Sequence, residues 1–114
     1  NLRRSMEVAR LLNDAGLIAI GSFVAPEEST RDRARDLVGR DRFVLVHLDA
    51  SLDHCRQALP GLYSDSSSIA LPGVDFPYET PRDADLVLST ESLDADACVE
   101  RILELLRSRG LIAS

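Results

Sequence analysis

Residues 43–58, FVLVHLDASLDHCRQA, contain the pattern that decides the fold. The first part, 43–49, is mostly apolar, as in a strand that is buried on both faces of a parallel sheet. Ala50-Ser51 then opens a predicted short helix, 51–58, and Asp49 is interpreted as the cap of that helix. A buried strand that runs directly into a helix is typical of an α/β domain.

The same alternation of strand and helix extends in both directions along the chain. Apolar runs predict further strands at 17–24, LIAIGSFV, and at 85–89, DLVLS. Amphipathic patterns with terminal caps predict helices at 2–15, 27–38 and 93–109, the last of them capped by Ser92. Strands that alternate with helices in this way predict an α/β fold with a parallel sheet and right-handed crossovers.

Residues 59–81, LPGLYSDSSSIALPGVDFPYETP, follow neither pattern. Long irregular segments inside compact domains are usually functional or disordered. In open α/β sheets, ligands bind at the carboxyl ends of the strands. Here these ends lie at 23–26, 48–51 and 89–91, and we expect 59–81 to act as a lid over them. The segment's aromatic side chains could line a ligand cleft or could pin the segment onto the sheet: Tyr63, Phe76 and Tyr78.

The composition limits the possible functions. A chain of 114 residues, 45% hydrophobic and 28% charged, is typical of one globular domain, 1–114. The net charge of −6 argues against nucleic acid as a partner, and no apolar run has the length of a membrane span. All 13 basic residues are arginine, so chemistry that needs a lysine on phosphates cannot come from this chain.

The cysteines and histidines do not form a metal-binding pattern. Cys55 and Cys98 lack CxxC spacing, so we predict free thiols, a cytoplasmic location and no metal site. His47 lies in a predicted buried strand and is interpreted as a core histidine, and His54 needs no function. Arg31 and Asp32 lie in a highly charged helix and are interpreted as solvated surface.

Several motifs resemble, in order, those of the adenylylsulfate (APS) kinase family. Its members phosphorylate the 3′-hydroxyl of adenosine 5′-phosphosulfate with MgATP. The most specific match is Gly-Val-Asp-Phe-Pro-Tyr-Glu-Thr-Pro at 73–81, which is similar to the family's Gly-Ile-Asp-x-Pro-Tyr-Glu-x-Pro. The other similar segments are Asn1-Leu2-Arg3-Arg4, Ala15-Gly16-Leu17-Ile18, Ser22-Phe23-Val24-Ala25-Pro26, Gly61-Leu62-Tyr63 and Cys98-Val99-Glu100.

The resemblance implies a P-loop-kinase-like three-layer α/β/α fold with a parallel sheet. The predicted strands 17–24, 43–49 and 85–89 would be the family's third, fourth and fifth strands, so we expect a sheet truncated to about three strands. The family's first strand, which lies between its third and fourth, and its P-loop are not among these residues. Three hypotheses for the gap remain open: a longer protein, direct pairing of 17–24 with 43–49, or a partner chain.

The resemblance also implies substrate-binding positions at Asn1, Val24, Ala25 and Leu71, whereas Asn1 taken by itself is more simply interpreted as a helix cap. Ala25 replaces a serine of the family, and Leu71 replaces a phenylalanine expected to stack on adenine. Glu28 replaces an arginine, and a basic stretch of the family is replaced by the acidic and small residues 64–68. Because APS is a dianion with an aromatic base, these changes should weaken its binding.

The sequence therefore predicts an APS kinase-like domain of sulfate activation that is inactive by itself. Phosphoryl transfer depends on positioning and on electrostatic stabilisation, and we predict no catalytic residue and no intact cofactor site here, MgATP being the family's cofactor. One alternative is a regulatory or scaffolding remnant associated with a sulfate adenylyltransferase, and another is an α/β protein with a changed ligand. Expected partners are APS and ATP if the missing third is present, and a second copy of the chain or a sulfate adenylyltransferase.

Overall fold

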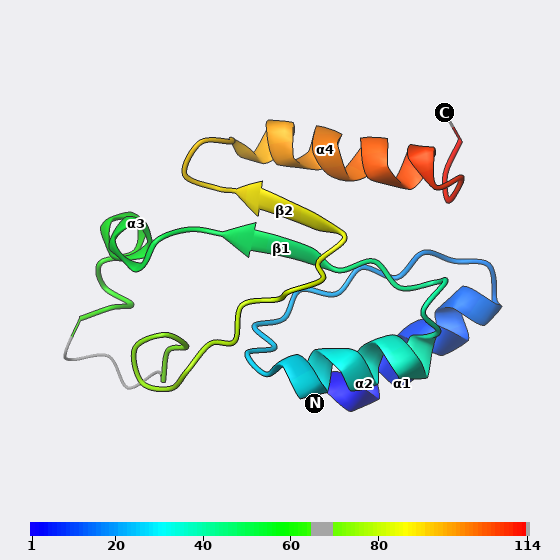
Figure 1. Cartoon of the computed structure of the whole chain (residues 1–114), viewed down its shortest axis with the longest axis horizontal. Coiled ribbons are helices and arrows are strands. Elements are labelled where there is room, and N and C mark those ends of the chain that lie inside the picture. Colours follow the sequence, from blue (N-terminus) through cyan, green and yellow to red (C-terminus); the bar gives the residue numbers. More distant parts are fainter. Residues whose placement is uncertain (65–69, 114) are drawn as a thin grey trace. The chain divides into compact units, whose positions relative to one another are not determined.

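The computed structural model describes residues 1–64 and 70–113. These residues form four helices and two strands in the order α1, α2, β1, α3, β2 and α4 (Figure 1). They divide into two compact units. The first unit contains Asn1–Phe43 and Ala70–Pro81, and the second contains Val44–Ile69 and Arg82–Ser114.

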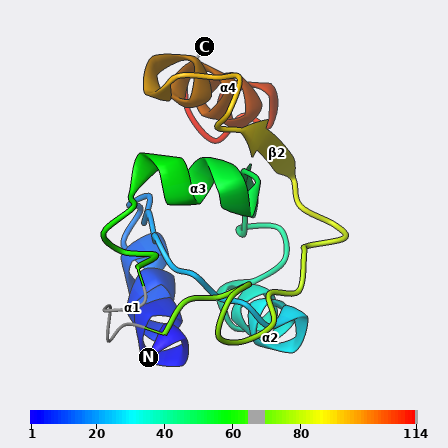
Figure 2. The same ribbon diagram turned by 90° about the vertical axis from the view of Figure 1, so that its left-hand side faces the viewer.

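The first unit is built on two helices that contact each other, α1 (Leu2–Asp14) and α2 (Glu28–Val38) (Figures 1 and 2). Asn1 occupies the N-cap position of α1, but its side chain makes no capping hydrogen bond. The carbonyl oxygen of Asn1 accepts hydrogen bonds from the backbone N–H and the hydroxyl of Ser5, each at 3.1 Å. Both helices were expected from their amphipathic patterns, and the structure confirms them.

Residues 17–24 form neither a helix nor a strand, so the predicted first strand is wrong. Their large apolar side chains are exposed, and Ile20 is 94% exposed. A strand needs neighbours that accept and donate its backbone hydrogen bonds, and the sheet in the described part of the chain has only two strands, β1 and β2. The hypothesis that 17–24 pairs directly with 43–49 is therefore also wrong for this sheet.

The second unit is built on a parallel pair of strands, β1 (Val46–Asp49) and β2 (Leu86–Ser89). Val46 is opposite Leu86, and the register ends with Asp49 opposite Ser89. In Figure 1 the two arrows lie side by side and point the same way, with α4 (Ala95–Ser108) along β2. The prediction of an α/β fold with a parallel sheet is confirmed, with two strands in place of three.

The helices of the second unit begin at side-chain caps. The predicted helix is confirmed as α3 (Leu52–Ala58), but its cap is Ser51 and not Asp49, because the hydroxyl of Ser51 accepts a hydrogen bond from the N–H of His54 at 3.1 Å. The α4 helix starts at Asp94, whose carboxylate accepts from the N–H of Ala97 at 2.8 Å. The predicted cap of α4 at Ser92 is therefore two residues early, because a carboxylate closer to the helix satisfies the free N–H groups.

The core of each unit is small. In the first unit the buried apolar side chains among the described residues are Ala34, Val38 and Leu71, and in the second unit Leu88 is completely buried. Asp85 joins the second unit's segments, because its carboxylate accepts from the N–H of Leu45 at 2.7 Å and from Arg109 at 2.8 Å. No described helix has the length and apolar character needed to cross a membrane.

Candidate functional site: a substrate loop held by a buried arginine

The residues that follow β1 and β2 meet at one edge of the sheet. The N–H of Thr90 donates to the carbonyl of Asp49 at 3.0 Å. The hydroxyl of Ser51 donates to the carboxylate of Glu91 at 2.6 Å, and His54 lies 3.9 Å from the same carboxylate. Two of the three segments that the ligand-site rule selected, 48–51 and 89–91, are thus brought together. The third, 23–26, belongs to the first unit.

The two histidines are placed as their sequence positions suggested. The side chain of His47 is 10% exposed, with Nε2 3.8 Å from a carboxylate oxygen of Asp49. The side chain of His54 is 41% exposed. His47 is a largely buried strand residue, which fits its interpretation as a core histidine.

The first unit contains a buried cation, Arg31, whose residue is only 3% exposed. Nη1 donates to the carbonyl of Ala25, and Nη2 donates to the carboxylate of Glu28, at 2.6 Å, and to the carbonyl of Glu79. The guanidinium carbon lies 5.7 Å from the centroid of the Tyr78 ring. The interpretation of Arg31 as solvated surface is therefore wrong, because segments distant in the sequence cover this side of α2.

Two motif segments that are some 50 residues apart in the sequence lie side by side around Arg31. The N–H of Glu79 donates to the carbonyl of Pro26 at 2.8 Å. The N–H of Glu28 donates to the carboxylate of Glu79 at 3.4 Å. These bonds and the contacts of Arg31 join 22–26 to 77–81. We call 22–26 the substrate loop after the substrate binding that the family resemblance predicts there. We use the name Arg31 cluster for Arg31, Ala25, Glu28, Tyr78 and Glu79.

The substrate loop has an unusual backbone at Ala25, which has φ 41°. This value lies in the left-handed region, where a side chain with a Cβ atom is disfavoured. Such conformations persist when the surroundings hold them, and they concentrate at functional sites. At Ala25 the holding contact is the hydrogen bond from Arg31 to its carbonyl oxygen.

A cavity of about 310 Å³ lies next to the Arg31 cluster, lined by Pro26, Glu27, Phe76, Pro77 and Glu79. Phe76 therefore faces a cavity, whereas Tyr78 lies against the guanidinium of Arg31. Tyr78 therefore holds its segment against α2 and not against the sheet, and a role of Phe76 in binding a ligand stays a prediction.

The four predicted substrate-binding residues all lie in the first unit. Val24 is 54% exposed and adjoins Ala25 in the substrate loop, and Asn1 is exposed at the start of α1. Leu71 is buried at 9% exposure. The structure places Ala25 in the Arg31 cluster, and the roles of all four residues in binding stay predictions.

Leu71 begins a tight turn that the Gly73-Val74-Asp75-Phe76 motif explains. Its N–H donates to the carboxylate of Asp75 at 2.7 Å, and its carbonyl accepts from the N–H of Asp75 at 2.8 Å. Gly73 has φ 82°, which a residue without Cβ adopts at little cost. Of the acidic and small stretch 64–68 that replaces the family's basic residues, 65–68 lie outside the described residues.

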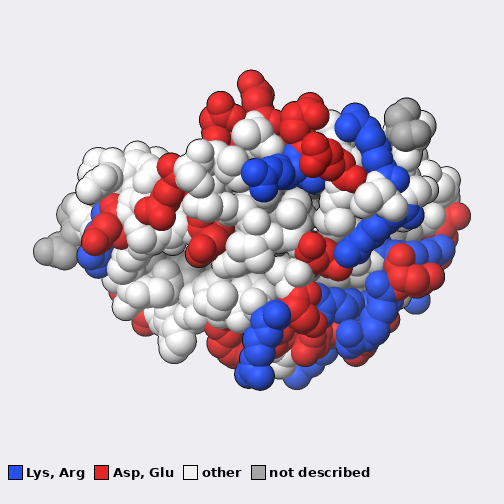
Figure 3. All heavy atoms as spheres, turned by 45° about the horizontal axis from the view of Figure 1, so that its top comes forward, with Lys and Arg blue, Asp and Glu red and all other residues white. Residues whose placement is uncertain are grey.

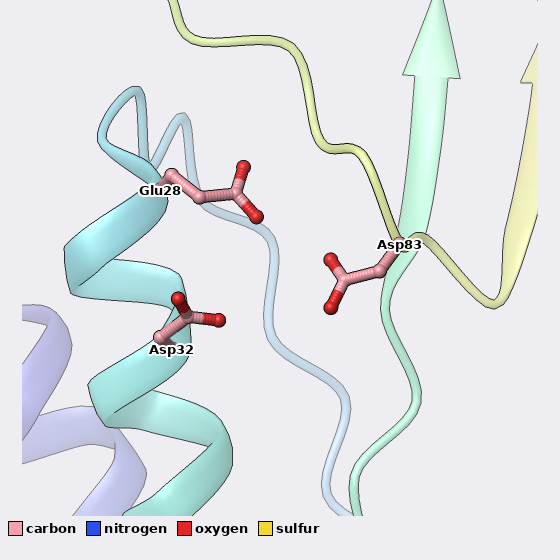
Figure 4. Close-up of side chains that lie close together, drawn as sticks. All are labelled: Glu28, Asp32 and Asp83. Carbon is pink, nitrogen blue, oxygen red and sulfur yellow. The ribbon is translucent and has the colours of Figure 1, made fainter.

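Two acidic side chains on α2, Glu28 and Asp32, are paired with arginines of the same helix. Figure 4 shows Glu28 and Asp32 one turn apart on α2. Glu28 is 2.6 Å from Arg31, and Asp32 is 3.3 Å from Arg35. The third residue labelled in Figure 4, Asp83, precedes β2 and belongs to the second unit. These pairings compete with any cation for the carboxylates of Glu28 and Asp32.

The net charge of −6 does not favour nucleic acid as a partner. On the face drawn in Figure 3, arginine side chains lie among acidic ones, and Asp and Glu outnumber Arg by 19 to 13 in the chain.

In the second unit, partial burial beside Cys55 raises the pKa of the Tyr63 phenol. This tyrosine is therefore held in its neutral form.

Comparisons with known proteins agree with these motifs. The family model described as adenylylsulphate kinase matches residues 1–89. The chain is 34% identical to an adenylyl-sulfate kinase of Acaryochloris marina, over 98% of this chain and 57% of that protein. It is 42% identical to the bifunctional enzyme NodQ of Azospirillum brasilense, over 97% of this chain and 18% of that protein.

A third relative is the bifunctional enzyme CysN/CysC of Rhodopirellula baltica, with 38% identity over 98% of this chain and 18% of that protein. The chain thus spans somewhat more than half the length of the kinase from A. marina and a smaller share of the bifunctional enzymes. Because the family model covers most of its residues, and covers both segments of the Arg31 cluster, this chain belongs to the adenylylsulphate kinase family.

Proposed function

We propose that this chain forms the substrate side of a kinase domain that transfers phosphate from ATP to the 3′-hydroxyl of APS. The observation that carries the proposal is the Arg31 cluster, which joins the substrate loop to 77–81. Both segments carry the family's motifs. A loop that positions a substrate must be held rigidly, since small misplacements of the reacting groups reduce catalysis strongly.

The residues of this chain do not fit a MgATP site. The N-termini of α2 and α4 carry acids, which disfavour phosphate there: Glu27 and Glu28 on α2, and Asp94 and Asp96 on α4. The chain contains no lysine, and Glu28 and Asp32 are paired with arginines. We therefore infer that ATP is bound by residues outside this chain, and that the chain alone does not phosphorylate APS.

The departures from the family's residue types gain a structural context. Glu28 pairs with Arg31. The position at which the family has a cation therefore carries an anion, which neutralises the charge of Arg31. Leu71 is buried in its own turn and offers no aromatic ring to a nucleotide. Both features support an affinity for APS below that of an enzyme with the family's usual residues.

The test is a 3′-phosphorylation assay with MgATP and APS, run on the complete gene-encoded protein and on the 114-residue chain. We expect product from the complete protein and none from the chain alone. Calorimetry with APS, the 3′-phosphorylated product and ADP then shows which ligand each form binds. A complete protein that neither binds APS nor phosphorylates it would refute the proposal.

A second candidate is a non-catalytic module associated with a sulfate adenylyltransferase. It is favoured by the bifunctional relatives, in which the matching segment is 18% of a longer protein. This candidate predicts that the complete protein binds neither APS nor ADP but forms a stable complex with a sulfate adenylyltransferase. Size-exclusion chromatography of the two proteins together measures that complex.

A further inference from the structure

We propose that Arg31 is a positioning residue that sets the conformation of the substrate loop, and through it the affinity for APS. This inference rests on the proposed function. It assigns Arg31 no contact with substrate. Arg31 acts through Ala25 and Pro26, whose carbonyl groups are tied to the guanidinium and to the N–H of Glu79.

The first observation that supports this role is the planar shape of the Arg31 guanidinium. One nitrogen, Nη1, holds the carbonyl of Ala25, and the other, Nη2, holds the carbonyl of Glu79 and the carboxylate of Glu28. A guanidinium is planar and its donors form a rigid fork. The two backbone segments are therefore fixed relative to each other by one flat group, which a lysine ammonium could not reproduce.

The second observation is the burial of Arg31. The residue is 3% exposed, and among the described residues its Nε has no hydrogen-bond partner. A buried cation with an unsatisfied donor is costly, and such groups in native structures call for an explanation beyond stability. Stability alone would be served by an apolar side chain of similar size. A requirement to hold two carbonyl groups explains why a cation is kept here.

The third observation is the backbone conformation of Ala25. Its φ of 41° is disfavoured for a residue with a Cβ atom, and its carbonyl oxygen is the group that Arg31 holds. Without Arg31, Ala25 is free to return to an ordinary φ. That change would turn the Ala25 carbonyl and displace the neighbouring Val24, which is 54% exposed and lies in the substrate loop.

The experiment compares three variants of the complete gene-encoded protein: R31Q, R31K and R35Q. Arg35 is the matched control because it is on the same helix, is 7% exposed, bonds to Asp32 and lies over the ring of Phe43. We expect R31Q to raise KM for APS by about tenfold or more, with KM for ATP within about twofold of the wild type. R31K should fall between the wild type and R31Q, and R35Q should leave KM for APS within about twofold.

Amide hydrogen exchange gives a second readout. R31Q should speed exchange at the N–H of Glu79, which donates to Pro26, while R35Q should not. If R31Q does not fold, R31K is measured by the same two criteria. Equal KM values for APS in R31Q and R35Q, or a KM for APS that R31Q leaves unchanged, would overturn the inference. If the wild-type protein does not use APS, the proposed function fails and this inference fails with it.

Discussion

Replacing Glu28 with arginine restores the residue type that the family resemblance implies at this position, yet we expect it to destabilise the first unit. In the structure the Glu28 carboxylate is 2.6 Å from Nη2 of Arg31. Glu28→Arg removes the only carboxylate hydrogen-bonded to Arg31 among the described residues and places a second cation beside it. The change therefore acts on a cation that cannot move into water without leaving its two carbonyl partners.

The magnitude follows from the burial of the pair. The side chains of Arg31 and Glu28 are 4% and 25% exposed. Breaking a fully buried ion pair costs about 3–5 kcal/mol, and an exposed pair contributes about 0–1 kcal/mol. For this largely buried pair we expect a loss of about 2–3 kcal/mol. A cation in the first turn of α2 adds about 0.3–1 kcal/mol through the helix dipole.

The matched control is Glu27→Arg, which makes the same change of charge at the exposed N-cap position next to Glu28. It carries the dipole cost but leaves the pair with Arg31 intact. The chain has two tyrosines and no tryptophan, so in a Tyr63→Phe background Tyr78 is the only reporter of tyrosine fluorescence. The Tyr78 ring lies 5.7 Å from the Arg31 guanidinium carbon, so it reports on this unit.

Urea unfolding is followed through Tyr78 in both variants. With an m-value of about 1–3 kcal/mol/M, a difference of about 2–3 kcal/mol corresponds to a midpoint about 0.7–3 M lower for Glu28→Arg than for Glu27→Arg. Equal midpoints would refute the reasoning, because they would mean that the buried pair contributes nothing beyond the dipole term. A Glu28→Gln variant should lie between the two.

Three further predictions concern the second unit. Leu88→Ala should lower the free energy of unfolding by about 2–5 kcal/mol, because Leu88 is completely buried, whereas Val87→Ala, at a position 54% exposed, should cost below about 1 kcal/mol in the same denaturation experiment. Asp85→Ala should speed amide exchange at Leu45 and cost about 1.5–3 kcal/mol, since the carboxylate accepts from that N–H and from Arg109; unchanged exchange would contradict this role. Because the pKa of Tyr63 is raised above the ordinary value of 10.0, the folded state holds the phenol proton more tightly than the unfolded state, so this contribution to stability is full below pH 10.0 and is lost as the pH rises through the folded-state pKa. In an alkaline titration followed by ultraviolet absorbance, the phenol ionisation that occurs at the highest pH should be missing from Tyr63→Phe. An unchanged titration curve would contradict the raised pKa of Tyr63.

The local elements could be predicted because the information for them is local. The helical spacing of apolar residues predicted α1, α2 and α4, and Ala50-Ser51 after a predicted strand indicated the start of α3, although the cap was assigned to Asp49 and not to Ser51. Two apolar runs separated by a helix predicted the parallel pair of β1 and β2. The motifs at 22–26 and 73–81 identified the family, which the family model confirms.

The segment 17–24 shows where local information ends. Its composition is that of a buried strand, and an apolar run has the same appearance whether or not a partner strand is present. In the structure it forms no strand, and Ile20 is 94% exposed. The composition of 17–24 indicates a segment that is suited to a buried strand. Forming that strand also requires another strand whose backbone groups pair with it in a suitable register.

For the candidate site, the sequence by itself determined which residue types are present: no lysine, a glutamate at position 28 and the Pro-Tyr-Glu-Thr-Pro motif at 77–81. Only the tertiary structure decided that Arg31 is buried and that it holds Ala25 and Glu79 together. A charged helix predicts an exposed arginine, because burial of a cation is costly unless it is paired. The groups that pair with Arg31 include carbonyls of the backbone, which every residue has, so no residue pattern signals them, and only folding brings them to the guanidinium.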